Sequence, residues 1–183
     1  MSAEKANCII QSIKAVVGEK VVAQSSVGDG LAEKLEAGLA GRRWNTVLEI
    51  GTLRGLSACV LACFAENVIT IDCDPHEDRE KVFKAAGKDI SNRISSVIIP
   101  DNDAKVILVR HLVFDGAFID AGHTEGQVAL DFSLAKRCGE LLFHDYPKSG
   151  SGCNGVGLVL DGATAAGDGV VTVCEPLAWW RAK

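Results

Sequence analysis

The chain has 183 residues, of which 48% are hydrophobic and 23% charged, and its formal net charge is −5. This length predicts one domain with a core of its own and excludes a second substrate-binding domain. The acidic balance argues against broad electrostatic binding to nucleic acid or to an anionic membrane. Without an apolar run of ~18 residues or a signal-peptide pattern, we expect a cytoplasmic protein with reduced cysteines.

The apolar pattern predicts helices and strands that alternate along the chain. Two helices, over 5–17 and 29–40, precede the first expected strand. After them come five strands, each followed by a helix, and then two closing strands. The expected strands are 46–50, 68–71, 94–99, 114–119, 141–143, 169–174 and 177–180, and the expected later helices are 54–66, 76–88, 102–112, 124–137 and 155–165.

This alternation predicts the α/β fold class, with a doubly wound seven-stranded sheet and helices on both faces. The sheet is expected to be mostly parallel, but the last strand is expected to be antiparallel because Glu175-Pro176 is too short for a crossover. We expect a single domain over 1–183. In it, the N-terminal helices of 1–43 would cover the substrate site, and 44–183 would form the core.

A glycine turn follows the first expected strand, in Glu49-Ile-Gly-Thr-Leu-Arg-Gly55. Gly51 would allow a tight turn and a close approach to a ligand, and Gly55 would let the next helix begin near the strand. Ligands of open α/β sheets bind at such strand ends, where the strand order reverses. The dinucleotide fingerprint requires a glycine where this chain has Glu49, which disfavours a nicotinamide dinucleotide. An ordinary strand-to-helix turn is the alternative.

Asp72 ends the second expected strand, about 20 residues beyond the glycine turn. An acid at this place can accept hydrogen bonds from two ribose hydroxyls. Asp74 is the second choice, and either residue could instead be a solvated surface acid.

Four segments in this order resemble class I S-adenosylmethionine-dependent methyltransferases, and most closely their small bacterial O-methyltransferase-like group. The segments are Glu49-Ile-Gly-Thr-x-x-Gly55, Ile-Thr-Ile-Asp72, Phe-Ile-Asp120-Ala-Gly-His123 followed by Val128 and Asp131-Phe132, and Leu-Phe-His144-Asp145-Tyr146. The resemblance covers 44–183 and implies a Rossmann-like fold with S-adenosylmethionine as cofactor. It implies methyl transfer to a small-molecule acceptor, with a hydroxyl oxygen as the expected target.

The same resemblance implies a role for particular residues. Asp72 would hold the ribose, Asp101 and Asn102 would contact the adenine amino group, and Asp120 would face the methyl group. For Asp101 and Asn102, helix capping is an equal alternative. The residues expected around the methionine part of the cofactor are Glu49, Gly51, Thr52, Gly55 and Ser57.

A divalent metal is a further hypothesis. Catechol-type O-methyltransferases, which the chain resembles more distantly, hold Mg²⁺ with an Asp after the fourth strand and an Asp-Asn pair after the fifth. Asp120 and Asp145 stand at two of these positions, and Tyr146 replaces the Asn. Two carboxylates can suffice for Mg²⁺, whereas a contribution from His123 or His144 would favour a softer metal.

Either His123 or His144 could be the general base, since an unperturbed histidine titrates at ~6.5. For His144, a ring held in the core by a hydrogen bond is the alternative. Tyr146 is expected to line the substrate pocket or to pack beneath the glycine turn. Of Trp179 and Trp180, one is expected to point inward and the other outward.

Two other functions stay open at this point: a non-catalytic S-adenosylmethionine-binding module and a nicotinamide-dependent oxidoreductase. Acceptor selectivity is expected in residues 1–43 and in the Gly/Ser loop of 146–155. Within that loop, Lys148 could bind a substrate anion or could be solvated. A homodimer could complete the pocket.

Overall fold

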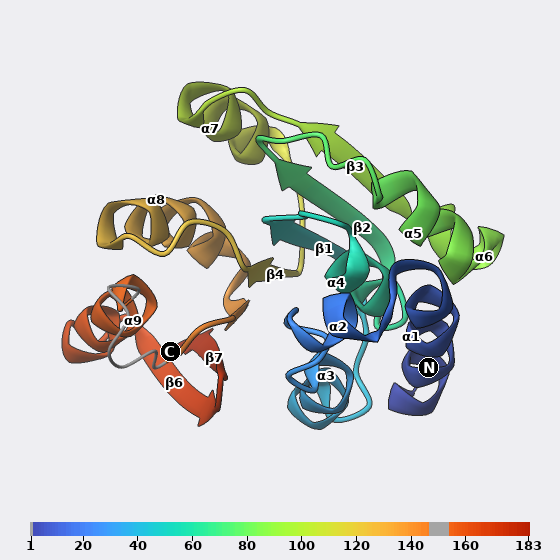
Figure 1. Ribbon diagram of the computed structural model, residues 1–183. Helices are drawn as coiled ribbons and strands as arrows, with labels where there is room; N and C mark the ends of the chain where they lie inside the picture. Colours follow the sequence, from blue (N-terminus) through green and yellow to red (C-terminus); the bar gives the residue numbers. More distant parts are fainter. Residues whose placement is uncertain (1, 147–153) are drawn as a thin grey trace.

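The computed structural model describes residues 2–146 and 154–183 and has the predicted α/β fold (Figure 1). The strands are β1 (Trp44–Ile50), β2 (Ala65–Asp72), β3 (Ile94–Ile98), β4 (Gly116–Ile119), β5 (Glu140–Phe143), β6 (Gly169–Cys174) and β7 (Leu177–Ala182). The helices are α1 (Ala3–Val17), α2 (Glu19–Ala23), α3 (Leu31–Leu39), α4 (Leu56–Leu61), α5 (Arg79–Ala86), α6 (Lys88–Ser91), α7 (Asn102–His111), α8 (Glu125–Ala135) and α9 (Gly155–Ala165). No helix within these ranges is long and apolar enough to cross a membrane.

The seven strands form one sheet in the order β3-β2-β1-β4-β5-β7-β6. Strands β1 to β5 pair in parallel, whereas β7 is antiparallel to both of its neighbours, β5 and β6. The mostly parallel sheet with an antiparallel last strand is therefore confirmed. The strand order reverses between β1 and β4, so the carboxyl ends of these two strands mark the expected ligand site.

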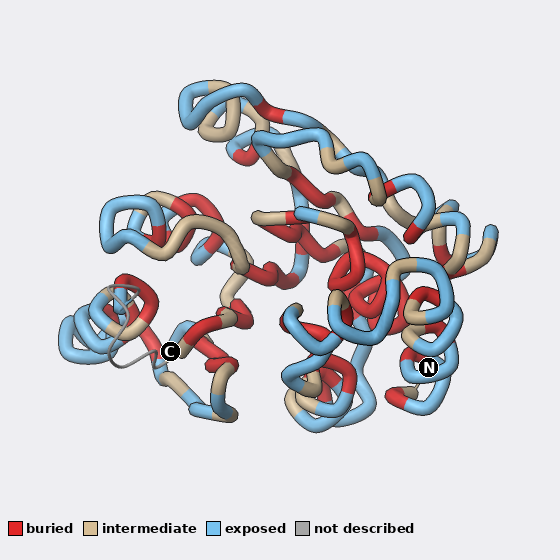
Figure 2. Tube along the Cα trace, in the orientation of Figure 1, coloured by how far each residue is buried: buried red, intermediate tan, exposed pale blue. Residues whose placement is uncertain are grey.

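Helices cover both faces of the sheet, because successive side chains of each strand point to opposite sides. In β1, Val47 belongs to the core under α1, α3, α4 and α5, while Leu48 belongs to the core under α7, α8 and α9. Figure 2 shows that the buried chain runs through the strands and the inner faces of the helices. The two cores therefore lie on opposite faces of the sheet.

The N-terminal segment packs mainly away from the ligand edge. Helix α1 buries Ile9 and Ile13 in the core that it shares with α3, α4 and α5. Val21 of α2 and the connection between α2 and α3, residues 24–30, approach the carboxyl ends of β4 and β5. The short helix α2 is an addition that the apolar pattern did not predict.

Several boundaries differ from the prediction. The helix expected over 54–66 is α4 alone, and β2 begins at Ala65 instead of residue 68. Since residues 56–65 are almost all buried and include no charge, periodicity could not show where the helix ends. The helix expected over 76–88 starts at Arg79 and ends at Ala86, and Gly87, whose φ is +88°, separates it from α6.

The strand expected over 114–119 begins at Gly116. Asp115 is not a strand residue: its carboxylate accepts hydrogen bonds from the backbone N–H groups of Asn45 and Thr46, at 2.7 and 2.8 Å.

The prediction that only one of Trp179 and Trp180 points inward is wrong. Both are buried, on opposite faces of β7, because α3 covers one face and α8 and α9 cover the other.

Candidate functional site

Two adjoining cavities lie along the carboxyl ends of the parallel strands, where the strand order reverses. The smaller, of about 360 Å³, is lined by Ile50, Gly51, Ile71, Asp72, Cys73, Ile99, Pro100, Asp101, Asn102, Lys105, Ala121, Gly122, Gln127 and Asp131. The larger, of about 510 Å³, is lined by Val21, Gln24, Ser25, Ser26, Gly51, Thr52, Leu53, Arg54, Leu56, Ser57, Asp72, Cys73, Asp120, Ala121, Gly122, His123, His144 and Asp145. They share the glycine turn and Asp72, so one ligand could extend from one cavity into the other.

The glycine turn brings the ends of β1 and β4 together. Gly51 has a φ of +100°, and a Cβ built on it would lie 2.1 Å from the backbone oxygen of Asp120. A Cβ on Gly55, whose φ is +83°, would lie 2.5 Å from the ring of Phe83. Both glycines are therefore required by close packing, as well as by their backbone conformation.

Asp72 holds this turn in place. Its Oδ2 accepts hydrogen bonds from the backbone N–H groups of Thr52 and Leu53, at 2.8 and 2.5 Å. Its Oδ1 accepts one from the N–H of Asp74, at 3.1 Å, and the guanidinium of Arg79 lies 3.5 Å from Oδ2. Burial alone would raise the pKa of Asp72, but these hydrogen bonds and the Arg79 charge outweigh it and lower the pKa. Asp72 is therefore a carboxylate at neutral pH.

Arg79 is a structural residue of the site that sequence reasoning missed. Its side chain is buried and donates from Nε and Nη2 to the backbone oxygen of Leu53, at 2.9 and 2.7 Å. Leu53 has a φ of +45°, an uncommon conformation for a non-glycine residue. By fixing Leu53 and Asp72 together, Arg79 determines the shape of the cavity wall.

Glu49 lies behind the cavities and not on their surface. It is fully buried, and its carboxylate accepts a hydrogen bond from Thr70, which also contacts the hydroxyl of Thr52. Its Oε1 has no hydrogen-bond partner among the described residues. Burial raises the pKa of Glu49 to about 7. Of the residues predicted around the methionine part, Gly51, Thr52 and Ser57 line the larger cavity, whereas Glu49 acts on it through Thr70 and Thr52.

Asp101 and Asn102 both line the smaller cavity, beyond the end of β3. Asp101 is also the N-cap of α7, since its Oδ1 accepts a hydrogen bond from the backbone N–H of Ala104 at 2.8 Å. The cap alternative is therefore correct for Asp101, and one of its carboxylate oxygens is occupied by the hydrogen bond to the helix.

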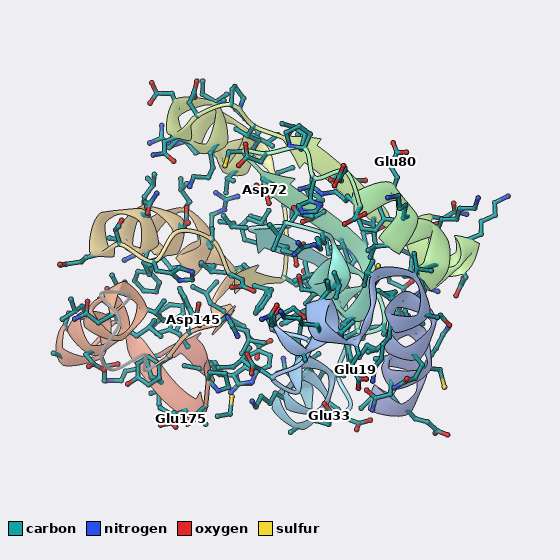
Figure 3. All side chains as sticks on the ribbon, in the orientation of Figure 1. Glu19, Glu33, Asp72, Glu80, Asp145 and Glu175 are labelled. Atoms are coloured by element: carbon teal, nitrogen blue, oxygen red, sulfur yellow. The ribbon has the colours of Figure 1, made fainter. Side chains whose placement is uncertain are left out.

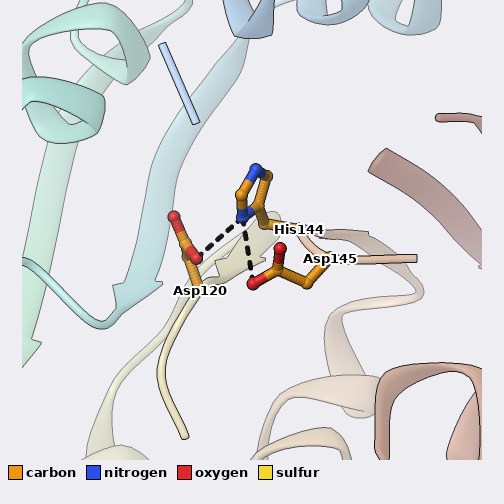
Figure 4. Close-up of side chains that lie close together, drawn as sticks. All are labelled: Asp120, His144 and Asp145. Carbon is orange, nitrogen blue, oxygen red and sulfur yellow. Dashed lines mark hydrogen bonds and ion pairs between the residues drawn. The ribbon is translucent and has the colours of Figure 1, made fainter. Parts of the chain in front are cut away.

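Asp120, His144 and Asp145 form a compact cluster on the larger cavity (Figure 4). Asp120 directly follows β4, and the other two residues follow β5, so the parallel pairing of β4 with β5 brings them together. The Nδ1 atom of His144 lies 3.1 Å from Oδ1 of Asp120 and 3.4 Å from Oδ2 of Asp145. Asp145 has a φ of +64°, which turns the chain sharply at this point.

A third carboxylate reaches the same histidine from the N-terminal segment. Asp29, in the connection before α3, lies with its Oδ2 2.8 Å from Nε2 of His144. Burial would lower the pKa of His144, but the hydrogen bonds to the carboxylates of Asp120, Asp145 and Asp29 raise it to about 10. Without a metal, His144 is therefore an imidazolium held by three acids.

His123 lies beside this cluster. Its Nδ1 is 3.2 Å from Oδ2 of Asp145, and its side chain is 35% exposed. Asp72 and Asp145, labelled in Figure 3, come from opposite halves of the sheet, so the two cavities together span the switch point.

Neither position predicted for Tyr146 is observed: its hydroxyl donates to Asp161 of α9, at 3.1 Å, and it lines neither cavity. Lys148 and residues 147–153 of the predicted loop lie outside the described residues.

The cluster has the composition of a metal site. In the part of the chain that the structure describes, Asp120, His144 and Asp145 are the one group of three acidic, histidine or cysteine ligands whose atoms lie within 4.8 Å of one another. Two carboxylates and an imidazole suit a divalent ion of intermediate softness better than they suit Mg²⁺. The third candidate ligand is therefore His144, whereas Tyr146, which occupies the position of the expected Asn, donates its hydroxyl to Asp161 of α9.

Residues 48–146, more than half of the chain, match a family described as a methyltransferase domain. The chain belongs to this methyltransferase family. Its fold and family together make it a class I S-adenosylmethionine-dependent methyltransferase, as the resemblance predicted, and they argue against a nicotinamide-dependent oxidoreductase. No curated protein sequence matches the chain.

Several solved structures share the fold of this methyltransferase at low sequence identity. Cofactor-bound Rv0187 from MTB is 20% identical, with a TM-score of 0.68 over 98% of this chain and 89% of that one. The O-methyltransferase from Bacillus cereus in complex with SAH is 15% identical, with a TM-score of 0.67 over 97% and 90%. The O-methyltransferase TomG from Streptomyces achromogenes in complex with SAM is 17% identical, with a TM-score of 0.66 over 98% and 90%.

Proposed function

We propose that this methyltransferase moves the methyl group of S-adenosylmethionine to the hydroxyl oxygen of a small molecule. The observation that carries the proposal is the cluster of Asp120, His144 and Asp145, with His123 beside it, on the larger cavity. Such a group of acids and histidines is needed to take a proton from a hydroxyl or to hold a cation beside it. The O-methyltransferases among the similar structures support the same choice of acceptor atom.

The residues of the two cavities fit the cofactor. The Asp72 carboxylate lies between the cavities, where it can accept a hydrogen bond from a ribose hydroxyl. Gly51 leaves no side chain in the way of a ligand at the β1 end. When bound, S-adenosylmethionine supplies a methyl group that its sulfonium already activates.

Because the methyl group is already activated, the protein's part is to align the acceptor and take up its proton. We assign the general base to His123. Nδ1 of His123 lies 3.2 Å from Oδ2 of Asp145, and a proton on this nitrogen would leave Nε2 to take a proton from an acceptor hydroxyl. His144 is less suitable, because the three acids around it raise its pKa to about 10 and keep it protonated. In this assignment Asp120 and His144 orient the acceptor.

We place acceptor selectivity in the connection between α2 and α3. Gln24, Ser25 and Ser26 line the larger cavity, and Asp29 contacts the cluster through His144. These side chains are polar, so the acceptor we propose is small and carries more than one hydroxyl.

A metal-assisted form of the same reaction has its own support in the ligand set. Asp120, His144 and Asp145 would hold the ion, which would lower the pKa of a bound hydroxyl and orient it. To bind an ion, His144 would have to be deprotonated at Nδ1. Asp29 would then fix the ring through Nε2, as outer carboxylates do for many metal-bound histidines.

The test combines binding with turnover. Calorimetry with S-adenosylhomocysteine measures cofactor binding, and transfer of a labelled methyl group is followed to catechols, phenols and alcohols, with amines and thiols of matching size as competitors. We expect transfer to oxygen, and we expect His123→Gln to lower kcat at least ~100-fold while the Kd for S-adenosylhomocysteine stays unchanged. His111→Gln, an exposed histidine at the end of α7, is the matched control.

Each other result has a defined meaning. Binding without turnover on any acceptor would support the non-catalytic module and overturn the enzyme proposal. Transfer to nitrogen or sulfur alone would overturn the choice of oxygen. Full activity of His123→Gln would remove His123 as the base.

A further inference from the structure

The connection between α2 and α3 is held by a side chain that the proposed reaction does not yet use. Lys34, near the start of α3, donates from Nζ to the backbone oxygens of Asp29 and Glu175, at 2.6 and 2.7 Å. Asp29 belongs to this connection, and Glu175, labelled in Figure 3, lies in the turn between β6 and β7. Lys34 therefore joins two segments that are far apart in the chain.

The contacts of Lys34 are to the backbone and not to an acid. Among the described residues, no carboxylate forms an ion pair with its half-buried side chain. An ammonium group has three donors, and Lys34 uses two of them on backbone oxygens. Such contacts fix the path of the chain at Asp29, whereas an ion pair would only neutralise the charge.

The turn between β6 and β7 is also bonded to the other half of the site. The backbone N–H of Tyr146, at the end of the cluster segment, donates to the backbone oxygen of Pro176 at 2.8 Å. Glu175 and Pro176 are consecutive, so one turn holds the segment of Asp29 and the segment of His144. These two segments meet again where Oδ2 of Asp29 lies 2.8 Å from Nε2 of His144.

We propose that Lys34 is a positioning residue: by tying Asp29 to the β6–β7 turn, it sets the ring of His144 on the larger cavity. This inference rests on the proposed methyl transfer, in which His144 helps to orient the acceptor. The Asp29 side chain is 40% exposed, so water competes for its carboxylate once the backbone is released. A shift of the acceptor by about 1 Å can cost about 100-fold in rate.

A double-mutant cycle separates this role from general stabilisation of the fold. Lys34→Met keeps the length of the side chain and removes its donors, and Asp29→Asn removes the charge that faces His144. The rate is kcat/KM for whichever catechol, phenol or alcohol the wild type methylates fastest. We expect Lys34→Met to lower it ~10-fold in the wild type but less than ~2-fold in Asp29→Asn, because both changes act through one contact.

Two further variants serve as controls. Lys34→Arg can still donate to both backbone oxygens and should keep at least about half of the wild-type rate. Lys20→Met changes an exposed lysine of α2 and should leave the rate unchanged. The Kd of S-adenosylhomocysteine, measured by calorimetry, should be the same in all variants, because Lys34 lines neither cavity.

Amide hydrogen exchange gives a second measurement that needs no acceptor. In Lys34→Met we expect the amides of 24–30 to exchange ~10-fold faster than in the wild type, while the later turns of α3 keep their rates. Unchanged exchange in 24–30, or an equal loss of rate in both backgrounds of the cycle, would overturn the inference and leave cofactor binding intact. If the wild type methylates no acceptor, the proposed function itself fails, and the inference fails with it.

Discussion

Asp72 combines two tasks in one carboxylate. The sequence places it at a strand end, where it suits ribose hydroxyls, and the structure shows that it also holds the backbone of the glycine turn. Oδ2 already accepts two N–H groups beside the charge of Arg79, whereas Oδ1 accepts only the N–H of Asp74. Its remaining capacity for a ligand is therefore on Oδ1.

Asp72→Asn should weaken cofactor binding and loosen the turn together. An amide cannot accept all these hydrogen bonds, and it removes the charge that pairs with Arg79. We expect the Kd for S-adenosylhomocysteine, measured by calorimetry, to rise ~10–100-fold, and the Tm to fall. Asp74→Asn makes the same charge change on an exposed neighbour and should leave both values near those of the wild type. The reverse result would assign the ribose to Asp74.

Divalent ions should bind at the cluster in a definite order. With one imidazole and two carboxylates, we expect equilibrium dialysis to show tighter binding of Mn²⁺ or Zn²⁺ than of Mg²⁺. Asp145→Asn should weaken Zn²⁺ binding at least ~10-fold, because one anionic ligand is lost. Asp161→Asn, the matched variant at the partner of Tyr146, should leave it unchanged. If none of the three ions binds, the cluster is not a metal site, and His123 and the acids transfer the proton without a metal.

At the scale of elements, close contacts fix how helices lie on the sheet. Helix α3 approaches β7 through Gly38, where a Cβ would lie 2.2 Å from the indole of Trp179. Trp179 is also stacked against Arg181 and lies 5.8 Å from the ring of Trp44. The N-terminal segment is thus fastened to the far half of the sheet, and this positions Asp29 at the cluster.

Gly38→Ala should therefore destabilise the fold although alanine favours helices. The added methyl group forces the indole of Trp179 or α3 to move, at a cost of about 1–3 kcal/mol in the free energy of unfolding. Gly162→Ala, in α9 with nothing near its Cβ, should instead stabilise the protein by up to about 1 kcal/mol. Urea unfolding of both variants checks this. Equal stability of the two would show that α3 shifts without cost.

At the scale of the whole molecule, the acids gathered at one edge of the sheet make stability depend on pH. Glu49 is the deepest of them, and burial raises its pKa from 4.5 to about 7. The folded state therefore binds this proton more strongly than the unfolded state does. The resulting stabilisation is complete below pH 4.5 and is lost as the pH rises through 7.

Glu49→Gln should remove this part of the pH dependence. Relative to wild type, its free energy of unfolding should increase between pH 4.5 and 7 by up to about 3 kcal/mol, because the neutral amide carries no buried charge. Urea unfolding across this range measures the difference. Glu80→Gln, which changes an exposed acid that projects from α5 in Figure 3, should follow the wild-type curve. A Glu49→Gln curve parallel to that of the wild type would contradict the buried titration.

The sequence by itself determined the alternation of elements, the antiparallel end of the sheet and the acids at the strand ends. These are local features: an apolar period, a short link between two strands and an acid after an apolar run are all visible within a few residues. The same locality explains the predicted positions of Gly51, Asp72, Asp120 and Asp145. Because the strands are parallel, their carboxyl ends, and the residues that follow them, lie at one edge of the sheet.

Tertiary structure alone decided which side chains meet. Asp29 lies 115 residues from His144 in the chain, and Lys105 lies 26 residues from Asp131. No periodicity links such positions, because helix packing and strand order set their distance. The positions of Glu49 behind the cavities and of Tyr146 outside them differ from the predicted ones for the same reason. A sequence shows which groups are available, whereas burial and contact, which depend on the whole fold, determine what those groups can do.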